Sequence, residues 1–173
     1  MLTRTEAANN SVSVRTQFCG GLAACQGDRV QLQQVMLNLI VNAIQAMSGI
    51  GEGARELQIS IDAVPSEGGV RVGVRDTGPG LSPESLSRLF EPFYTTKPEG
   101  MGMGLSICRS IIEAHGGRLW AIPCEPQGAL FQFTIPAAHS QGPARPLEDH
   151  NLPGRIALRS DRGTMGSRWP DRR

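Results

Sequence analysis

A long, mostly apolar run at positions 29–47, RVQLQQVMLNLIVNAIQAM, limits the folds open to this chain. Apolar side chains recur on most sides of a 3.6-residue period, which predicts a helix buried nearly all round. Asp28 is the predicted N-cap, and Gly49 is expected to supply the C-terminal turn. Such a helix needs other elements packed around it, so the chain must build a sizeable core.

Amide side chains interrupt this helix within a sector of roughly 80°. They are Gln31, Gln34, Asn38, Asn42 and Gln45. A buried amide without a partner costs about 1–3 kcal/mol, so this face of the helix should open on something polar. Asn38 and Asn42, one turn apart, can present oxygens to a common ligand. An amphipathic surface helix with an exposed amide stripe remains the alternative.

A carboxylate is predicted to face the core at the end of a strand. Val70, Val72 and Val74 alternate along a strand at 70–75, and the same parity places Asp76 on the core side. An ionised carboxylate there must find a donor or shift its pKa. The following Thr77-Gly78-Pro79-Gly80 segment lets backbone approach closely, which suits a flat heterocycle such as adenine. An ordinary turn that ends a strand is the alternative.

A second glycine loop, Gly100-Met101-Gly102-Met103-Gly104, precedes a predicted helix at 105–115. Backbone N–H groups and a helix N-terminus facing outward together form a phosphate site. The loop is not a P-loop, because no Gly-Lys-Ser/Thr follows, and it lacks the preceding strand of a dinucleotide fold. Lys97 is the only lysine of the chain and is well placed for a phosphate. An unremarkable surface lysine is the alternative.

Strands and helices alternate along most of the chain. Further strands are predicted at 11–16, 56–64, 118–122 and 129–135, with the last two forming a hairpin. A short helix is predicted from Pro83 to about Phe90, with Ser82 as its N-cap. Residues 1–10 are expected to be a short N-terminal remnant. Residues 137–173 carry seven cations against four acidic groups and lack periodicity, which predicts a disordered basic tail.

Charge and cysteine content exclude several function classes. The 173 residues carry a net charge of +1, which gives no argument for nucleic acid or an anionic membrane. No apolar run approaches the roughly 18 residues that a membrane span needs. The four cysteines, which match no zinc or disulfide pattern, are interpreted as reduced thiols of a cytoplasmic protein.

The order of these motifs resembles a known family. The asparagine-rich helix, DTGPG, LFEPFYTTK, GMGMGL and HGG follow one another as in the ATP-binding catalytic domain of sensor histidine kinases, of the superfamily shared with gyrase, Hsp90 and MutL. The resemblance covers residues 11–136. It implies an α/β (α+β) two-layer sandwich of Bergerat type, with a mixed sheet of about five strands covered on one face by about three helices.

The resemblance also implies roles for individual residues. Asn42 would ligate Mg²⁺, Asn38 would support the phosphate end of ATP, and Asp76 would accept from the adenine amino group. The remaining positions of the implied ATP site are Gly78, Gly80, Phe90, Phe93, Thr96, Lys97, Gly100, Gly102, Gly104 and Leu105.

Two departures from the family pattern bear on activity. Many members carry a glutamate, a suspected base, where this chain has Gln34, which takes no proton. With Asn38, Gln34 marks the expected catalytic end, and reduced base assistance is expected rather than loss of activity. No phosphoacceptor hairpin precedes residue 11, so the reacting histidine is expected in trans. A response regulator would act downstream, and the isolated chain is expected to be a monomer.

Four other functions remain open, two of them within the same superfamily. A nucleotide-sensing module without transferase activity is favoured by Gln34 and by the missing acceptor. An anti-sigma-type serine kinase or a gyrase-like ATPase belongs to the same superfamily, but the nine-residue LFEPFYTTK run argues against both. A structural domain without a ligand would have to explain both the amide stripe and Asp76.

Overall fold

The computed structural model describes residues 10–50, 53–64, 68–97 and 100–138. The chain comprises two compact units, 1–140 and 141–173, and every described residue belongs to the first. The predicted tail beyond Ala138 and the remnant before Asn10 therefore lie outside the described residues. The described elements are β1 (Ser13–Phe18), α2 (Arg29–Ser48), β2 (Glu56–Val64), β3 (Gly69–Asp76), α3 (Pro83–Arg88), α4 (Gly104–Ala114), β4 (Arg118–Pro123) and β5 (Ala129–Pro136).

The strands of the described region form one five-stranded mixed sheet in the order β1-β2-β3-β5-β4. β1 runs parallel to β2 and is connected to it through α2, whereas the other three pairs are antiparallel. A parallel pair requires such a crossover, which explains why the long helix lies between the first two strands in sequence. β3 lies at the centre, so Asp76 at its end is flanked by β2 and β5.

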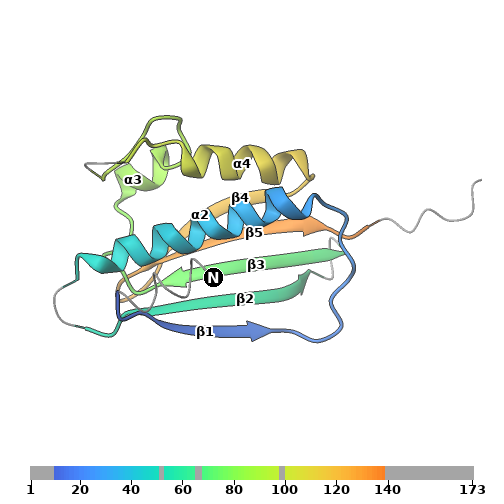
Figure 1. Ribbon diagram of the computed structural model, residues 1–173, viewed down its shortest axis with the longest axis horizontal. Coiled ribbons are helices and arrows are strands. Elements are labelled where there is room, and N and C mark those ends of the chain that lie inside the picture. The colour runs from blue at the N-terminus through green and yellow to red at the C-terminus, as the bar shows by residue number, and fades with distance from the viewer. Residues whose placement is uncertain (1–9, 51–52, 65–67, 98–99, 139–173) are drawn as a thin grey trace, which may run out of the picture. The chain divides into compact units, whose positions relative to one another are not determined.

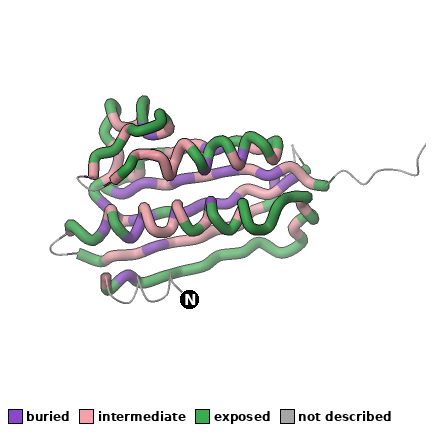
Figure 2. The backbone as a smooth tube through the Cα atoms, turned by 45° about the horizontal axis from the view of Figure 1, so that its top comes forward, coloured by how far each residue is buried: buried purple, intermediate pink, exposed green. Residues whose placement is uncertain are grey.

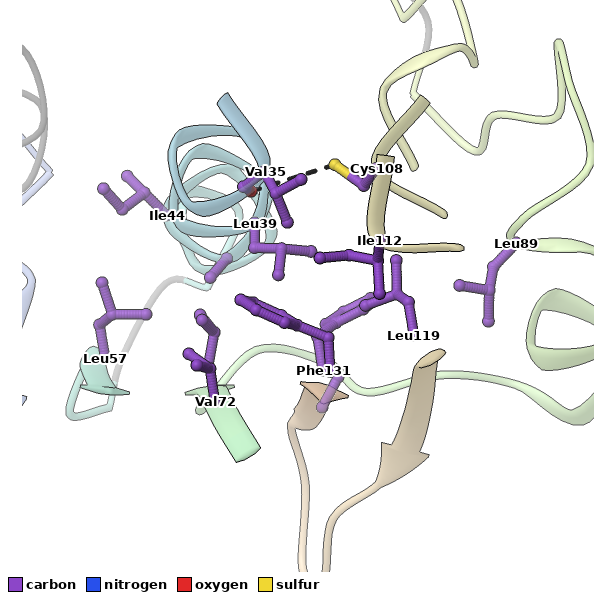
Figure 3. Packing of buried hydrophobic residues seen from close by; sticks show 14 of the residues in the cluster. Val35, Leu39, Ile44, Leu57, Val72, Leu89, Cys108, Ile112, Leu119 and Phe131 are labelled. Carbon is purple, nitrogen blue, oxygen red and sulfur yellow. Dashed lines mark hydrogen bonds between the residues drawn. The ribbon is translucent and has the colours of Figure 1, made fainter. Parts of the chain in front are cut away.

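Helices cover one face of this sheet, with α2 and α4 lying along it (Figure 1). α2 packs on β3 and on α4, and α4 also packs on β4. Figure 3 shows the resulting core, in which Leu39 of α2 and Ile112 of α4 lie above Val72 and Phe131 of the sheet. The two-layer architecture predicted from the sequence is confirmed. No helix in the described ranges is long and apolar enough to cross a bilayer.

The expectation that α2 is buried nearly all round is wrong. Val35, Leu39, Ala43, Ile44 and Met47 are buried, but Val30 is 72% exposed and Leu37 is 40% exposed. α2 is covered by the sheet below and by α4 on one flank, which leaves the rest of its surface open. Its N-cap is as predicted, because the Asp28 carboxylate accepts from the N–H groups of Val30 and Gln31.

Gly49 is the C-cap of α2, as predicted, and has φ −81°. Two other local predictions differ from the structure. β1 begins two residues later than predicted, because Ser11 has φ +54° and interrupts the extended backbone. α3 ends at Arg88 rather than near Phe90, although Ser82 caps it as predicted. Figure 2 shows β1 exposed along the edge of the sheet.

His115 joins the two long helices. Its Nε2 accepts from the N–H of Asp28 at 2.9 Å, and its Nδ1 donates to the carbonyl of Ile111 at 2.7 Å. The ring therefore connects the start of α2 to the end of α4. Gly116 then turns the chain with φ +72° into the β4–β5 hairpin.

Candidate functional site

The amide stripe of α2 lies at the boundary between core and solvent. Gln31, Gln34 and Gln45 are exposed, whereas Asn38 and Asn42 are half-buried. A fully exposed stripe is therefore the wrong interpretation for the two asparagines. Each of them has a side-chain partner from a segment far away in the sequence.

The ammonium group of Lys97 lies against this stripe. Its Nζ donates to Asn42 Oδ1 at 3.0 Å and to Gln45 Oε1 at 2.7 Å. Lys97 has no ion pair with any acidic group of the described residues. Burial lowers the pKa of the Lys97 ammonium, because desolvation penalises its charged form. The two amide oxygens thus already face a cation.

Asn38 contacts the second long helix. Its Nδ2 donates to the sulfur of Cys108 at 3.5 Å, and the Cys108 thiol in turn donates to the carbonyl of Val35 at 4.0 Å (Figure 3). Cys108 is fully buried, and burial raises the pKa of its thiol. This contact directs Nδ2 of Asn38 toward α4, so that Oδ1 is the atom left for another partner.

Asp76 is the only buried charged residue in the described part of the chain, with an exposed fraction of 2%. Its Oδ1 accepts from the N–H of Gly78 at 2.8 Å and from the N–H of Ala129 at 3.3 Å. No hydrogen bond from the described residues reaches Oδ2. Burial raises the pKa of the Asp76 carboxyl, although those two N–H groups and the charge of Arg75 act in the opposite direction. An amine that donates to Oδ2 would stabilise the charged form.

The loop after Asp76 is held against α2. A Cβ at Gly78 would lie 2.7 Å from Asp76 Oδ1 and 3.2 Å from Cβ of Ala46, so only glycine fits between them. Gly80 has φ +86°, a conformation that other residues rarely adopt. Thr77 fixes the loop to β2 by donating to the carbonyl of Ala54 and accepting from the N–H of Glu56.

The second glycine loop ends at the uncapped start of α4. Met103 occupies the N-cap position and supplies no side-chain acceptor to the first turn. The N-terminal N–H groups of a helix have no intrahelical partner, so they are available to an anion. A Cβ at Gly104 would meet no atom within 4 Å, so the backbone there is openly accessible. Leu105 follows within α4 and packs against the core.

An unusual backbone contact joins the LFEPFYTTK segment to this loop. Phe93 has φ +67°, which is rare for an aromatic residue, and its N–H donates to the carbonyl of Gly102 at 2.9 Å. Gly102 also has φ +67°, and a Cβ there would lie 2.5 Å from the carbonyl carbon of Phe93. Gly100 approaches Lys97 and Thr95 in a similar way. The two predicted motifs therefore form one structural unit.

Two of the predicted groups, the Asp76 loop and Lys97, converge along α2, and a third contact comes from a residue that was not predicted. The Asp76 loop contacts Ala46, Lys97 contacts Asn42 and Gln45, and Cys108 of α4 contacts Asn38. Phe90 packs at the edge of the core beside Arg109. The remaining side chains do not converge, because Gln34 and Thr96 are exposed without a side-chain hydrogen bond to described residues and Phe93 is 75% exposed.

A hollow of about 560 Å³ lies away from these residues. It is lined by Gly116, Gly117, Arg118, Trp120 and Thr134. The side chains of Trp120 and Thr134 alternate with the core residues Leu119 and Phe133, so they belong to the sheet face opposite the helices. None of the predicted site residues lines this hollow. Its volume therefore does not count against a nucleotide site on the exposed face of α2.

Sequence reasoning missed two contacts of this site. Gln45 stood in the predicted stripe without a role, and its partner Lys97 lies 52 positions away. Cys108 gave no signal, because a single buried thiol inside an amphipathic helix looks like an ordinary core residue. The only sign of the contact between Gln45 and Lys97 in the sequence is that Lys97 is the single lysine of the chain.

Comparisons with known proteins identify the family of this chain. The family model described as histidine kinase-, DNA gyrase B- and HSP90-like ATPase matches residues 27–139. The sensor histidine kinase TmoS of Ectopseudomonas mendocina is 40% identical over 138 residues, which are 80% of this chain and 14% of TmoS. The chain spans between 14% and 29% of the length of the curated relatives it matches.

Solved structures give the same result. The nucleotide-free catalytic domain of histidine kinase ThkA is 33% identical with a TM-score of 0.67, over 78% of this chain and 85% of that one. Full-length ShkA in complex with AMPPNP is 30% identical with a TM-score of 0.68, over 78% of this chain and 27% of that one. ThkA is also known in complex with the response regulator protein TrrA, with 31% identity and a TM-score of 0.66 over 79% of this chain and 37% of that one. This chain therefore belongs to the histidine kinase-, DNA gyrase B- and HSP90-like ATPase family, as a catalytic domain of the histidine kinase type.

Proposed function

We propose that this domain binds Mg²⁺–ATP between α2 and the two glycine loops and transfers the γ-phosphoryl group to a histidine of a separate helical hairpin. The observation that carries the proposal is Asp76, a buried carboxylate with an unbonded oxygen beside a bare glycine. Burying a charge of this kind is unfavourable unless a donor compensates it, so its presence favours a ligand with an amine.

Adenine supplies the donor that Asp76 lacks. The exocyclic amine of the ring would donate to Oδ2, while Oδ1 stays bonded to Gly78 and Ala129. The volume that a side chain at Gly78 or Gly80 would take is filled by Asp76, Ala46 and Gly128, and a flat ring would lie against the backbone of this loop. A purine with a carbonyl at that position would present an acceptor to a carboxylate, so Asp76 favours adenine over guanine.

The phosphates would lie further along α2, toward Asn42 and Asn38. Mg²⁺ prefers oxygen ligands, and Asn42 presents an amide oxygen that already accepts from a cation, so this donor fits the ion. When bound, Mg²⁺ supplies neutralisation of the charge that develops on the phosphates. Lys97 and the N–H groups of Gly102, Gly104 and Leu105 would hold the phosphate oxygens, and Asn38 would orient the terminal group. Gly100, whose N–H donates to the carbonyl of Lys97, would shape the loop around them. Phe90, Phe93 and Thr96 would flank this loop.

The transfer itself requires a partner. The γ-phosphoryl group moves from the terminal bridging oxygen of ATP to an imidazole nitrogen, and ADP leaves. The phosphohistidine then passes the group to an aspartate of a response regulator, and the relative ThkA has been captured with such a protein. We further propose a cytoplasmic location, where ATP and reduced thiols coexist, and a monomeric state for the isolated chain.

A nucleotide-binding module without transferase activity is the second candidate. It is favoured by Gln34, which is exposed at the second position of the stripe and has no proton-accepting group. Positioning and charge neutralisation provide most of the catalysis in phosphoryl transfer, so we expect slower transfer rather than none.

Calorimetry tests the binding step. Asp76→Ala is expected to abolish measurable ATP affinity while the fold persists, because the amine of adenine loses its acceptor. Circular dichroism of the variant provides the control. An unchanged affinity in Asp76→Ala would refute the assignment of adenine to this loop.

Radiolabelled Mg²⁺–ATP tests the transfer step. The chain is incubated alone and with a cognate dimerisation hairpin as a separate polypeptide. Label on the hairpin supports the kinase function. Label on this chain alone contradicts transfer in trans, and nucleotide binding without any labelled product supports the second candidate.

A further inference from the structure

The contact of Lys97 with Asn42 raises a question that the proposed function leaves unanswered. Asn42 Oδ1 is the oxygen proposed for Mg²⁺, yet here it accepts from the ammonium of Lys97 at 3.0 Å. One amide oxygen does not serve an ammonium and a metal ion at the same time, because the two cations repel each other at contact distance. The arrangement of this structure and an Mg²⁺-bound arrangement are therefore mutually exclusive at this atom.

The second acceptor of Lys97 holds the ammonium in this position. Gln45 Oε1 accepts at 2.7 Å, the shorter of the two contacts, and Gln45 lies almost one turn after Asn42 on the same face of α2. The Lys97 backbone is fixed separately, since its N–H donates to Thr95 Oγ1 and its carbonyl accepts from the N–H of Gly100. The side chain can therefore change partners without moving the loop that carries it.

No acidic group within the described ranges forms an ion pair with this ammonium. Two neutral amide oxygens compensate a full positive charge less well than an anion does. An ammonium has three N–H donors, and the two amides use two of them. The third N–H of Lys97 can therefore donate to a phosphate oxygen whether or not Lys97 is bonded to Asn42. Binding of Mg²⁺ to Asn42, in contrast, requires Lys97 to leave that oxygen.

We propose that Lys97 occupies the metal-ligand oxygen of Asn42 in the nucleotide-free domain and releases it when Mg²⁺–nucleotide binds, with Gln45 as the positioning residue that sets the cost of release. This inference rests on the proposed function. It assigns Gln45 a role in metal-dependent affinity although Gln45 itself contacts neither metal nor nucleotide.

Gln45→Met tests the role of Gln45, because methionine keeps the length of the side chain and removes the oxygen. Release of Lys97 becomes easier, so the affinity for Mg²⁺–ADP measured by calorimetry should rise about threefold to tenfold. With ADP in EDTA the affinity should stay unchanged, because nothing then competes for Asn42. The matched control is Gln31→Met, an exposed amide of the same stripe without a side-chain partner, which should alter neither affinity.

A spectroscopic readout follows Lys97 directly. Lys97 is the only lysine in the 173 residues, so labelling with [¹³Cε]lysine gives one NMR signal. In the nucleotide-free protein this signal should differ between wild type and Gln45→Met. At saturation with Mg²⁺–ADP the two signals should coincide, because Lys97 has then left Gln45. Gln31→Met should follow the wild type throughout.

Three results overturn the inference, and the first of them is distinguishable from the other two. If no ADP binds with or without Mg²⁺, the proposed function fails and this inference fails with it. If Mg²⁺–ADP binds but the lysine signal stays at its Gln45-dependent position, the nucleotide site stands and the exchange at Asn42 is wrong. Equal gains in affinity with Mg²⁺ and with EDTA would also contradict it.

Discussion

The two ends of the proposed nucleotide site are built differently. At the adenine end, Asp76 is the last residue of the central strand β3. Its Oδ1 accepts from two backbone N–H groups, those of Gly78 and Ala129. At the phosphate end, Phe93 and Met101 are 75% and 76% exposed, and loop contacts such as Phe93 to Gly102 hold the backbone. The sheet therefore fixes the base-recognition group, whereas the phosphate end depends on loop geometry that few buried apolar contacts support.

This difference predicts how substitutions act. Changes at the adenine end should remove binding without altering the fold, because the sheet holds the backbone whatever side chain is present. Changes at the phosphate end should act either by straining the loop or by crowding the phosphates.

Asp76→Asn should have the largest effect. Asparagine keeps an acceptor for Gly78 and Ala129 but places an NH₂ group where Oδ2 faces the adenine amine. Two donors then meet, and loss of a charge-assisted bond costs about 1.5–3 kcal/mol, so affinity for ATP should fall about tenfold to 150-fold. Calorimetry measures the loss, and GTP provides the control. If the variant prefers ATP over GTP as strongly as the wild type does, Asp76 is not the group that recognises adenine, and the difference proposed between the two ends is wrong.

Gly102→Ala should have the next largest effect. The Cβ would lie 2.5 Å from the carbonyl carbon of Phe93, at a φ of +67° that alanine tolerates poorly. Strain of about 1–3 kcal/mol should distort the loop and weaken Mg²⁺–ATP binding about tenfold. The thermal midpoint should change little, because the loop adds little to the core. A large fall in that midpoint would contradict the assignment of Gly102 to a separable loop.

Gly104→Ala is the matched substitution at the same loop. A Cβ there meets no atom within 4 Å, and alanine favours helix by about 0.8–1 kcal/mol, so the nucleotide-free protein should become slightly more stable. A loss of Mg²⁺–ATP affinity of a few-fold would then reflect crowding of the phosphates alone. Unchanged affinity would exclude Gly104 from the phosphate contacts.

The pH dependence of stability should show the smallest effect. Because burial raises the folded-state pKa of Asp76, the folded protein holds this proton more tightly than the unfolded chain does. The free energy of unfolding should therefore decrease as pH rises through the interval between the two pKa values. Asp76→Asn should unfold at a higher temperature than wild type at pH 7, and the difference should vanish below that interval. Denaturation series at several pH values check the sign.

Most of the adenine end could be predicted from local pattern. The parity of Val70, Val72 and Val74 carried over to Asp76, because alternation along a strand is a property of the backbone itself. The N-caps Asp28 and Ser82 could also be predicted locally, because each cap side chain bonds to an N–H group within three positions. The bounds of β2 agree with the predicted range 56–64, because alternation marks both of its ends.

The phosphate end was less predictable. The contacts of Lys97 with Gln45, of Cys108 with Asn38 and of Phe93 with Gly102 join residues that are distant in sequence, so no local pattern reveals them. The positive φ of Phe93 arises from that tertiary contact, against the intrinsic preference of an aromatic residue. The burial of α2 was overestimated because apolar content alone does not say how many neighbours a helix has.

A crystal structure of the full chain with Mg²⁺ and AMPPNP tests the central claim most directly. The adenine ring should lie beside Gly78, with its exocyclic amine within hydrogen-bond distance of Asp76 Oδ2 and its phosphates toward Asn42. Asp76 turned away from the ring, or a ring bound at any other surface, would contradict the account.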